Sequence, residues 1–128
     1  MPQNYTNNTV VYTGTHDNAT TRGWYRELSA DLRRNVWGLL ERSEDTEAHV
    51  VPALLALAWS SRAALTVAPL QDVLNLGNEA RMNVPGRANG NWGWRCDDRL
   101  LAPAIEHLRL LTRNAGRALP PASARRVS

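Results

Sequence analysis

Two short runs of strand-forming residues, far apart in the chain, place the strongest constraint on its fold. Residues 10–15 are mostly β-branched or aromatic, and residues 63–68 form a continuous apolar run that ends at Pro69. Helical patterns fill the space between the two runs. A strand followed by helices and a second strand predicts a parallel βαβ crossover, in which both strands end at the same edge of the sheet. The sequence therefore predicts an α/β fold, with polar groups gathering where these strands end.

Capping residues and apolar spacing place four helices. The first three lie between the strands, and the fourth closes the chain. The third is so apolar that we expect it to be buried on most sides, with Trp37 of the second helix and Trp59 of the third in the core. The expected helices run from Thr20 or Thr21 to Leu28, from Ser29 to about Glu41 with an apolar face of Leu32, Val36, Leu39 and Leu40, from Asp45 or Thr46 to Trp59 with Pro52 in the first turn, and from about Pro103 to a C-cap at Gly116.

Charge and cysteine content limit the classes of protein to which the chain can belong. Residues 1–112 hold 11 arginines against 12 acidic residues, and residues 113–128 add four arginines, so the net charge of +3 belongs to the C-terminal end. We therefore predict a folded segment over residues 1–116 and a disordered basic tail over residues 117–128. Scattered arginines argue against a nucleic-acid surface. A single cysteine and the absence of a leader or long apolar segment favour a cytoplasmic protein without a membrane partner.

His16 and Asp17 stand at the tip of the first predicted strand, where an α/β barrel presents catalytic groups. The same residues, followed by Thr20 and Thr21, are also compatible with ordinary turn and N-cap chemistry, and the local pattern favours that alternative. We expect no metal or cofactor, because the other histidines lie on predicted helices without ligand spacing. The other loop acids, which are Asp72, Glu79, Asp97 and Asp98, are expected to form caps or ion pairs.

The segment over residues 69–95 is long and rich in glycine and asparagine, as functional loops often are. It contains Trp92 and Trp94. These side chains could plug the core or provide stacking surfaces for a sugar ring, and we favour the plug.

Two long motifs stand out in the sequence, namely Asn4-Tyr5 with Thr9-Val10-Val11-Tyr12-Thr13-Gly14-Thr15-His16-Asp17-Asn18-Ala19-Thr20-Thr21-Arg22-Gly23-Trp24, and Pro69-Leu70-Gln71-Asp72-Val73-Leu74 with Gly77-Asn78-Glu79-Ala80-Arg81-Met82-Asn83, Pro85-Gly86, Gly90-Asn91-Trp92 and Trp94-Arg95. Together they resemble the 4-α-glucanotransferases, also called amylomaltases or disproportionating enzymes, of the α-amylase clan. The resemblance covers roughly residues 2–115. Ala19 departs from the pattern, since the family usually has an acidic residue there, and this change is expected to weaken the following helix start.

The resemblance implies that the chain is the C-terminal portion of a (β/α)₈ barrel, with about two parallel strands and several helices, incomplete as a barrel. The implied reaction transfers a segment of an α-1,4-glucan to the 4-hydroxyl of glucose or of another α-1,4-glucan, with retention. Its implied partners are α-1,4-glucans, maltooligosaccharides and glucose. A barrel of this kind needs about 250 residues, so these 128 residues would be completed by the missing N-terminal part of the barrel.

The resemblance also assigns site residues. Asp17 is the carboxylate that stabilises the transition state, while His16 and Asn83 bind substrate. The nucleophile and the acid/base would lie upstream of Met1, so the chain alone is expected to be inactive. Two alternatives stay open. One is a non-catalytic fragment that binds glucan or assembles with another chain, and the other is a small RNA-binding module based on the arginine tail and the two loop tryptophans.

Overall fold

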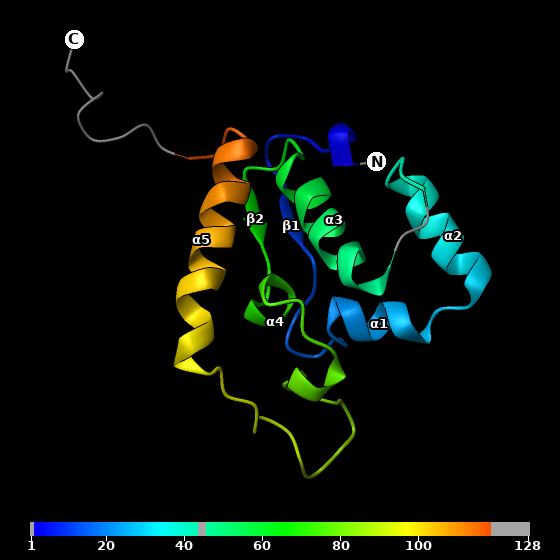
Figure 1. Ribbon diagram of the computed structural model, residues 1–128, viewed down its shortest axis with the longest axis vertical. Coiled ribbons are helices and arrows are strands. Elements are labelled where there is room, and N and C mark those ends of the chain that lie inside the picture. Colours follow the sequence, from blue (N-terminus) through cyan, green and yellow to red (C-terminus); the bar gives the residue numbers. More distant parts are fainter. Residues whose placement is uncertain (1, 44–45, 119–128) are drawn as a thin grey trace, which may run out of the picture.

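The chain folds into a small α/β unit in a computed structural model, which describes residues 2–43 and 46–118 (Figure 1). Helices and two short strands follow one another along the chain. The elements in order are a 3-10 turn η1 (Pro2–Asn4), β1 (Val10–Tyr12), α1 (Thr21–Glu27), α2 (Ala30–Leu39), α3 (Glu47–Trp59), β2 (Leu65–Val67), α4 (Leu70–Val73), a 3-10 turn η2 (Asn78–Ala80) and α5 (Asp98–Asn114).

The sheet confirms the predicted crossover. Within the described residues β1 and β2 pair in parallel, with Val10 opposite Leu65 and Tyr12 opposite Val67. A bond from the Thr13 N–H to the Val67 carbonyl extends the pairing by one step. Both strands therefore end at the same edge of the sheet, where α4 and the segment before α5 also lie (Figure 1).

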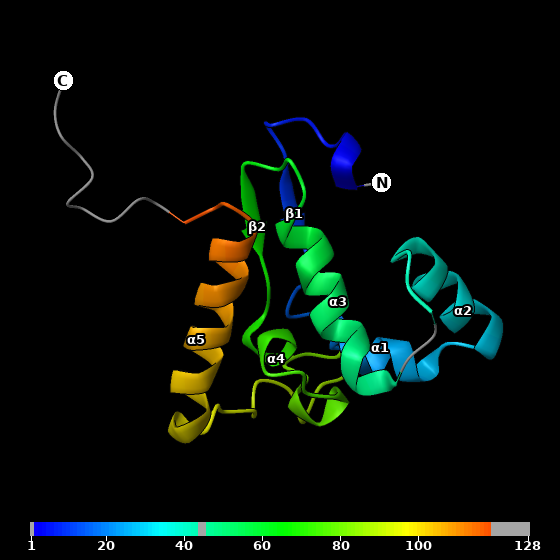
Figure 2. The ribbon, with the colours of Figure 1, turned by 45° about the horizontal axis from the view of Figure 1, so that its top comes forward.

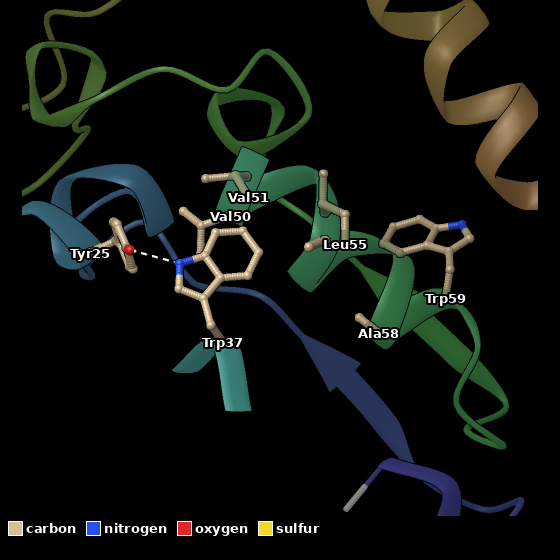
Figure 3. Packing of buried hydrophobic residues seen from close by; sticks show 8 residues of the cluster. Tyr25, Trp37, Val50, Val51, Leu55, Ala58 and Trp59 are labelled. Atoms are coloured by element: carbon tan, nitrogen blue, oxygen red, sulfur yellow. Dashed lines mark hydrogen bonds between the residues drawn. The ribbon is translucent and has the colours of Figure 1, made fainter. Parts of the chain in front are cut away.

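The core lies mainly among helices α1, α2 and α3, and Val11 of β1 packs against it. Trp37 is buried and its indole N–H donates to the Tyr25 hydroxyl at 2.9 Å (Figure 3). Trp59 is also buried, and its N–H donates to Thr112 Oγ1 of α5 at 3.1 Å. Both tryptophans are thus core residues, as predicted, and each satisfies its polar atom as buried indoles require. Helix α3 supplies most of the remaining core, namely Val50, Val51, Ala53, Leu55 and Ala58.

The sheet is covered on one face only. Val11 packs against the core cluster, whereas Val10, Tyr12 and Leu65, which point to the opposite face, are exposed. Figure 2 shows α3 crossing β1 while α5 runs beside β2. Strands of a parallel sheet are normally covered on both faces, so the uncovered face is an apolar surface suited to further packing.

Helix α2 packs through part of the predicted apolar face, through Val36 and Leu40 but not Leu32 and Leu39. Leu32 and Leu39 are exposed, and the helix instead buries Trp37, with Val36 and Leu40 partly buried beside it. The larger indole gains more from burial than either leucine, and it also finds a hydrogen-bond partner in Tyr25. Apolar spacing therefore predicted the packing of Val36 and Leu40 correctly and that of Leu32 and Leu39 wrongly.

Helix α5 begins earlier than the predicted start at Pro103. The Asp97 carboxylate accepts from the Arg99 N–H at 3.0 Å and caps a helix that starts at Asp98. The predicted C-cap at Gly116 is confirmed, because Gly116 has a φ of 67° and the N–H groups of Gly116 and Arg117 bond to the carbonyls of Arg113 and Thr112. This arrangement is a Schellman motif.

Pro52 lies sixth in α3, beyond the first turn where we expected it. A proline at this position cannot donate to the carbonyl of Ala48, four residues earlier. The side chain of Asn75 supplies the missing donor, since its Nδ2 reaches that carbonyl at 2.7 Å. Asn75 itself follows the end of α4 and has a φ of 56°. The segment over residues 69–95, which we predicted as one long loop, begins instead with the short helix α4 and the turn η2.

Most of the predicted tail, from position 119 onward, lies outside the described residues. Arg117, which we assigned to that tail, is bound to the folded unit. Its guanidinium donates from Nε to the Trp59 carbonyl at 2.6 Å and from Nη2 to the Ala63 carbonyl at 2.8 Å. Among the helices that the structure describes, none combines the length and hydropathy that a membrane crossing requires.

Candidate active site

The loops that follow β1 and β2 meet at the carboxyl edge of the sheet. The chain leaves β1 through residues 13–20 and leaves β2 through Pro69 into α4, and residues 81–97 return to the same edge (Figure 1). A hollow of about 390 Å³ opens here, with Tyr12, His16, Gln71 and Arg81 among its lining residues. In parallel α/β sheets, ligands bind at this edge.

Asp17, His16 and Asn83 lie together at this edge. The Asn83 Nδ2 donates to Asp17 Oδ1 at 2.6 Å, and His16 Nε2 lies 3.4 Å from the same oxygen. The side chains of His16 and Asp17 are 57% and 49% exposed. The structure therefore gathers all three residues that the resemblance assigned to substrate, and it leaves them accessible. Asp17 does not cap α1, so the simple N-cap explanation does not apply to it.

Asn18 shapes the turn that carries His16 and Asp17. Its Oδ1 accepts from both the N–H and the hydroxyl of Thr15, at 2.8 and 2.9 Å, and its own N–H bonds to the Thr15 carbonyl. Turn chemistry and site chemistry thus coexist in the same stretch. Asn18 serves the turn, which frees the side chains of His16 and Asp17 to face the hollow and Asn83.

Arg81 joins the loop after β1 to the segment after η2, a role that the sequence analysis missed. Its Nη2 donates to the Asp17 carbonyl and its Nε donates to the Asn83 carbonyl, each at 2.7 Å. The Asn83 N–H also bonds to the His16 carbonyl at 3.2 Å. The two loops are therefore fixed to each other through their backbones, and the spacing of Asp17 and Asn83 depends on Arg81. Its position two residues before Asn83 was the only signal available in the sequence.

The buried carboxylate of Asp72 stabilises the same edge of the sheet through hydrogen bonds. Its side chain is 1% exposed and accepts three bonds, from Thr13 Oγ1 at 2.7 Å, from the Thr21 N–H at 2.9 Å and from Thr21 Oγ1 at 2.7 Å. This carboxylate caps α1 and ties it to the end of β1. The expected capping role of Asp72 is confirmed, and the carboxylate also stabilises both ends of the loop that carries Asp17.

Two side chains cap the start of α1, next to Ala19, where the resemblance leads us to expect an acidic residue. Thr20 Oγ1 accepts from the Gly23 N–H at 3.1 Å, and Asp72 satisfies the Thr21 N–H. Gly23 allows a close approach to η2, because a Cβ at this position would lie 2.1 Å from Asn78 Oδ1. The start of α1 is thus capped by Thr20 and by the carboxylate of Asp72 in α4, and the weakening at Ala19 stays a prediction.

Charged groups brace α1 against α3. Glu47 Oε1 accepts from Arg22 Nε at 2.6 Å and from Arg26 Nε at 2.8 Å. The Arg22 hydrogen bond, followed by that of Arg26, holds the pKa of the Glu47 carboxyl below its usual range. Glu79 accepts from the Gly77 N–H at 2.7 Å, and backbone hydrogen bonds lower its pKa in the same direction. These acids position elements and lie outside the group formed by Asp17, His16 and Asn83.

The two loop tryptophans differ from each other. Trp92 is 52% exposed, so the favoured core-plug interpretation is wrong for this residue, whereas Trp94 is partly buried. The Trp92 ring lies beside the His16 ring, with centroids 5.1 Å apart and planes tilted by 39°. In the part of the chain that the structure describes, no cluster of three histidine, cysteine or acidic side chains could hold a metal.

Comparison with known proteins identifies the family to which the chain belongs. The family model described as 4-alpha-glucanotransferase matches residues 1–101. The chain belongs to the 4-alpha-glucanotransferase family. The 4-alpha-glucanotransferases of Synechocystis and Thermus thermophilus are 48% identical over 121 residues and 50% identical over 103 residues. These matches cover 93% and 74% of this chain, but only 24% and 20% of the relatives.

A solved structure of the same family agrees. Amylomaltase from Streptococcus agalactiae, in complex with acarbose, superposes with a TM-score of 0.82 at 28% identity, covering 93% of this chain and 24% of that protein. The chain thus spans about a quarter of the length of these 4-alpha-glucanotransferases. Its fold, with parallel β1 and β2 and the helices around them, matches the corresponding part of an amylomaltase.

Proposed function

We propose that this chain forms one side of a 4-α-glucanotransferase active site, in which Asp17 stabilises the transition state while His16 and Asn83 hold the same glucose ring. The observation that carries the proposal is the contact between Asp17 and Asn83, which the fold brings together from the two loops at the carboxyl edge. Transfer with retention passes through an oxocarbenium-like transition state with a distorted ring. Hydroxyl contacts to Asp17 that strengthen as the ring flattens would lower the barrier.

The apolar surfaces of the chain support a place inside a larger (β/α)₈ barrel. Tyr12 is 58% exposed and Leu65 is 53% exposed on the face of the sheet away from α3. A second hollow of about 560 Å³ lies beside β1, with Val11, Trp24 and Leu57 in its lining. A barrel would fill the sheet face with side chains from other strands and would cover the hollow with a neighbouring element. Residues 1–116 are then a segment of that catalytic barrel.

Catalysis in this proposal requires two further carboxylates, a nucleophile and an acid/base, held roughly 5 to 5.5 Å apart. The relatives are four to five times longer than the matched segment, and we place both groups in their additional length. The isolated chain is therefore expected to bind α-1,4-glucans without transferring them. Loss of a nucleophile generally lowers the rate by several orders of magnitude.

A chimera tests this proposal. We would join the 128 residues to the portion of the Thermus thermophilus relative that precedes its matched segment, and assay glucose release and chain lengthening from maltotriose. The chimera is expected to disproportionate maltotriose, and the isolated chain is expected to be inactive. A folded but inactive chimera would contradict the proposed site, and activity of the isolated chain would contradict the need for upstream carboxylates.

A further inference from the structure

Trp92 is an exposed aromatic side chain that the polypeptide holds in an uncommon backbone conformation. Its φ is 60°, a left-handed value that bulky residues rarely adopt. Its side chain is nevertheless about half exposed, so burial of the ring does not offset the strain. Strain of this kind tends to occur at ligand clamps and active sites. A surface ring held in this way therefore suggests a contact that the isolated chain does not make.

Several hydrogen bonds fix the backbone around Trp92. Its N–H donates to the Met82 carbonyl at 2.6 Å, and Arg95 Nη1 donates to its carbonyl at 2.8 Å. The preceding residue, Asn91, accepts from the Val84 N–H at 2.9 Å and donates to the Arg87 carbonyl at 2.9 Å, which closes the loop before Trp92. The ring is therefore presented on a fixed backbone rather than on a free loop.

The ring of Trp92 lies directly beside the residues placed in the active site. Its centroid is 5.1 Å from that of His16, and His16 Nε2 lies 3.4 Å from Asp17 Oδ1. The Met82 carbonyl that accepts from Trp92 belongs to the residue before Asn83, which bonds to Asp17. Trp92 thus extends the polar group of Asp17, His16 and Asn83 with an apolar wall on the side of His16.

We propose that Trp92 is a sugar-stacking residue, on which an α-1,4-linked glucose unit next to the ring held by Asp17 lays its apolar C–H face. This inference rests on the proposed function and assigns a specificity-determining residue to it. A pyranose ring has hydroxyls at its rim and C–H groups on its faces, so a site for it needs polar groups beside an aromatic plane. Trp92 supplies the plane, and His16, Asp17 and Asn83 supply the hydrogen bonds.

The test is a titration of the unmodified 128-residue chain with maltoheptaose, followed by NMR. The indole N–H signal of Trp92 is assigned by its loss in Trp92→Tyr, and the backbone signals of His16 and Asn83 are followed in parallel. All three are expected to shift with one common binding curve. Trp92→Ala is expected to weaken binding about tenfold, and Trp92→Tyr, which keeps an aromatic plane, is expected to retain most of the affinity.

Trp24→Ala is the matched control, because Trp24 is another partly exposed tryptophan (41% exposed), carried on α1, and should leave maltoheptaose affinity unchanged. Shifts at His16 and Asn83 without a shift at Trp92, or unchanged affinity in Trp92→Ala, would overturn the stacking role and leave the proposed function intact. A titration that moves none of these signals would overturn the stacking role as well. The activity of the chimera then decides separately whether the proposed function stands.

Discussion

Asp72 is the residue on which the support of the site depends most. It is almost completely buried, and its two oxygens satisfy one N–H and two hydroxyls from the end of β1 and the start of α1. A buried donor left without an acceptor costs about 1–3 kcal/mol, whereas an amide in place of the carboxylate can still accept from the N–H while the hydroxyls reverse their roles.

We therefore expect Asp72→Ala to lower the free energy of unfolding by about 3 kcal/mol and Asp72→Asn by about 1 kcal/mol. Urea unfolding of the 128-residue chain measures both. Glu106→Ala is the control, since this exposed carboxylate pairs with Arg109 on its own helix and its loss should cost less than about 0.5 kcal/mol. Equal losses in Asp72→Ala and Glu106→Ala would show that Asp72 does not hold the loop.

At the scale of elements, Glu47 makes the packing of α1 on α3 dependent on pH. Its pKa is lowered in the folded chain, mainly because Arg22 donates to it, so its ionised form stabilises the fold. The stabilisation is fully present above the usual pKa of 4.5 and is lost as the pH falls through the lowered folded value.

Glu47→Gln is therefore expected to reduce stability at pH 7 by less than about 1 kcal/mol, because the carboxylate is partly solvated. This difference from the unmodified chain should shrink as the pH falls from 7 to below the lowered folded pKa of Glu47, where the native carboxylate also becomes protonated. Thermal unfolding followed by circular dichroism at the two pH values measures it. A difference that stays constant between the two pH values would contradict the assigned role of the ionised carboxylate.

Local rules predicted the elements well where one signal dominated. Thr20 and Ser29 cap α1 and α2, and the two strands pair in parallel as the crossover predicts. Two errors have a common cause, since in each case a tertiary partner outweighed the local pattern. Helix α2 buries Trp37 rather than Leu32 and Leu39, because the Tyr25 hydroxyl accepts a hydrogen bond from the buried indole. Pro52 lies deeper in α3 than the first turn, because Asn75 donates to the carbonyl that proline leaves without a donor.

The site was predictable only in part, for a similar reason. Parallel strands place their ends together, which brought the loop of Asp17 near the start of α4 as expected. The contact with Asn83 depends on Arg81, whose hydrogen bonds go to main-chain carbonyls and leave no pattern in the sequence. Trp92 is exposed and has a positive φ, and composition predicts neither property.

At the scale of the whole molecule, the helices cover one face of the sheet and leave the other face apolar and accessible. Val10, Tyr12 and Leu65 lie on this open face, and in the described part of the chain no third strand pairs with either outer edge. Unpaired edges and apolar faces favour association with further protein. In the proposed function, this open face packs against the rest of a larger barrel, and the chain contributes the edge at which Asp17 contacts Asn83.

The most direct test of the proposed role of Asp17 is to compare the turnover number of the chimera with that of its Asp17→Asn variant. Asp17→Asn preserves the size of the side chain and removes the charge that the transition state requires. We predict that maltotriose disproportionation falls by at least about 10²-fold in kcat. Asp31→Asn, at an exposed carboxylate on α2, should leave kcat unchanged. A chimera in which Asp17→Asn keeps kcat within about threefold of the parent would contradict the assignment of Asp17 to the transition state.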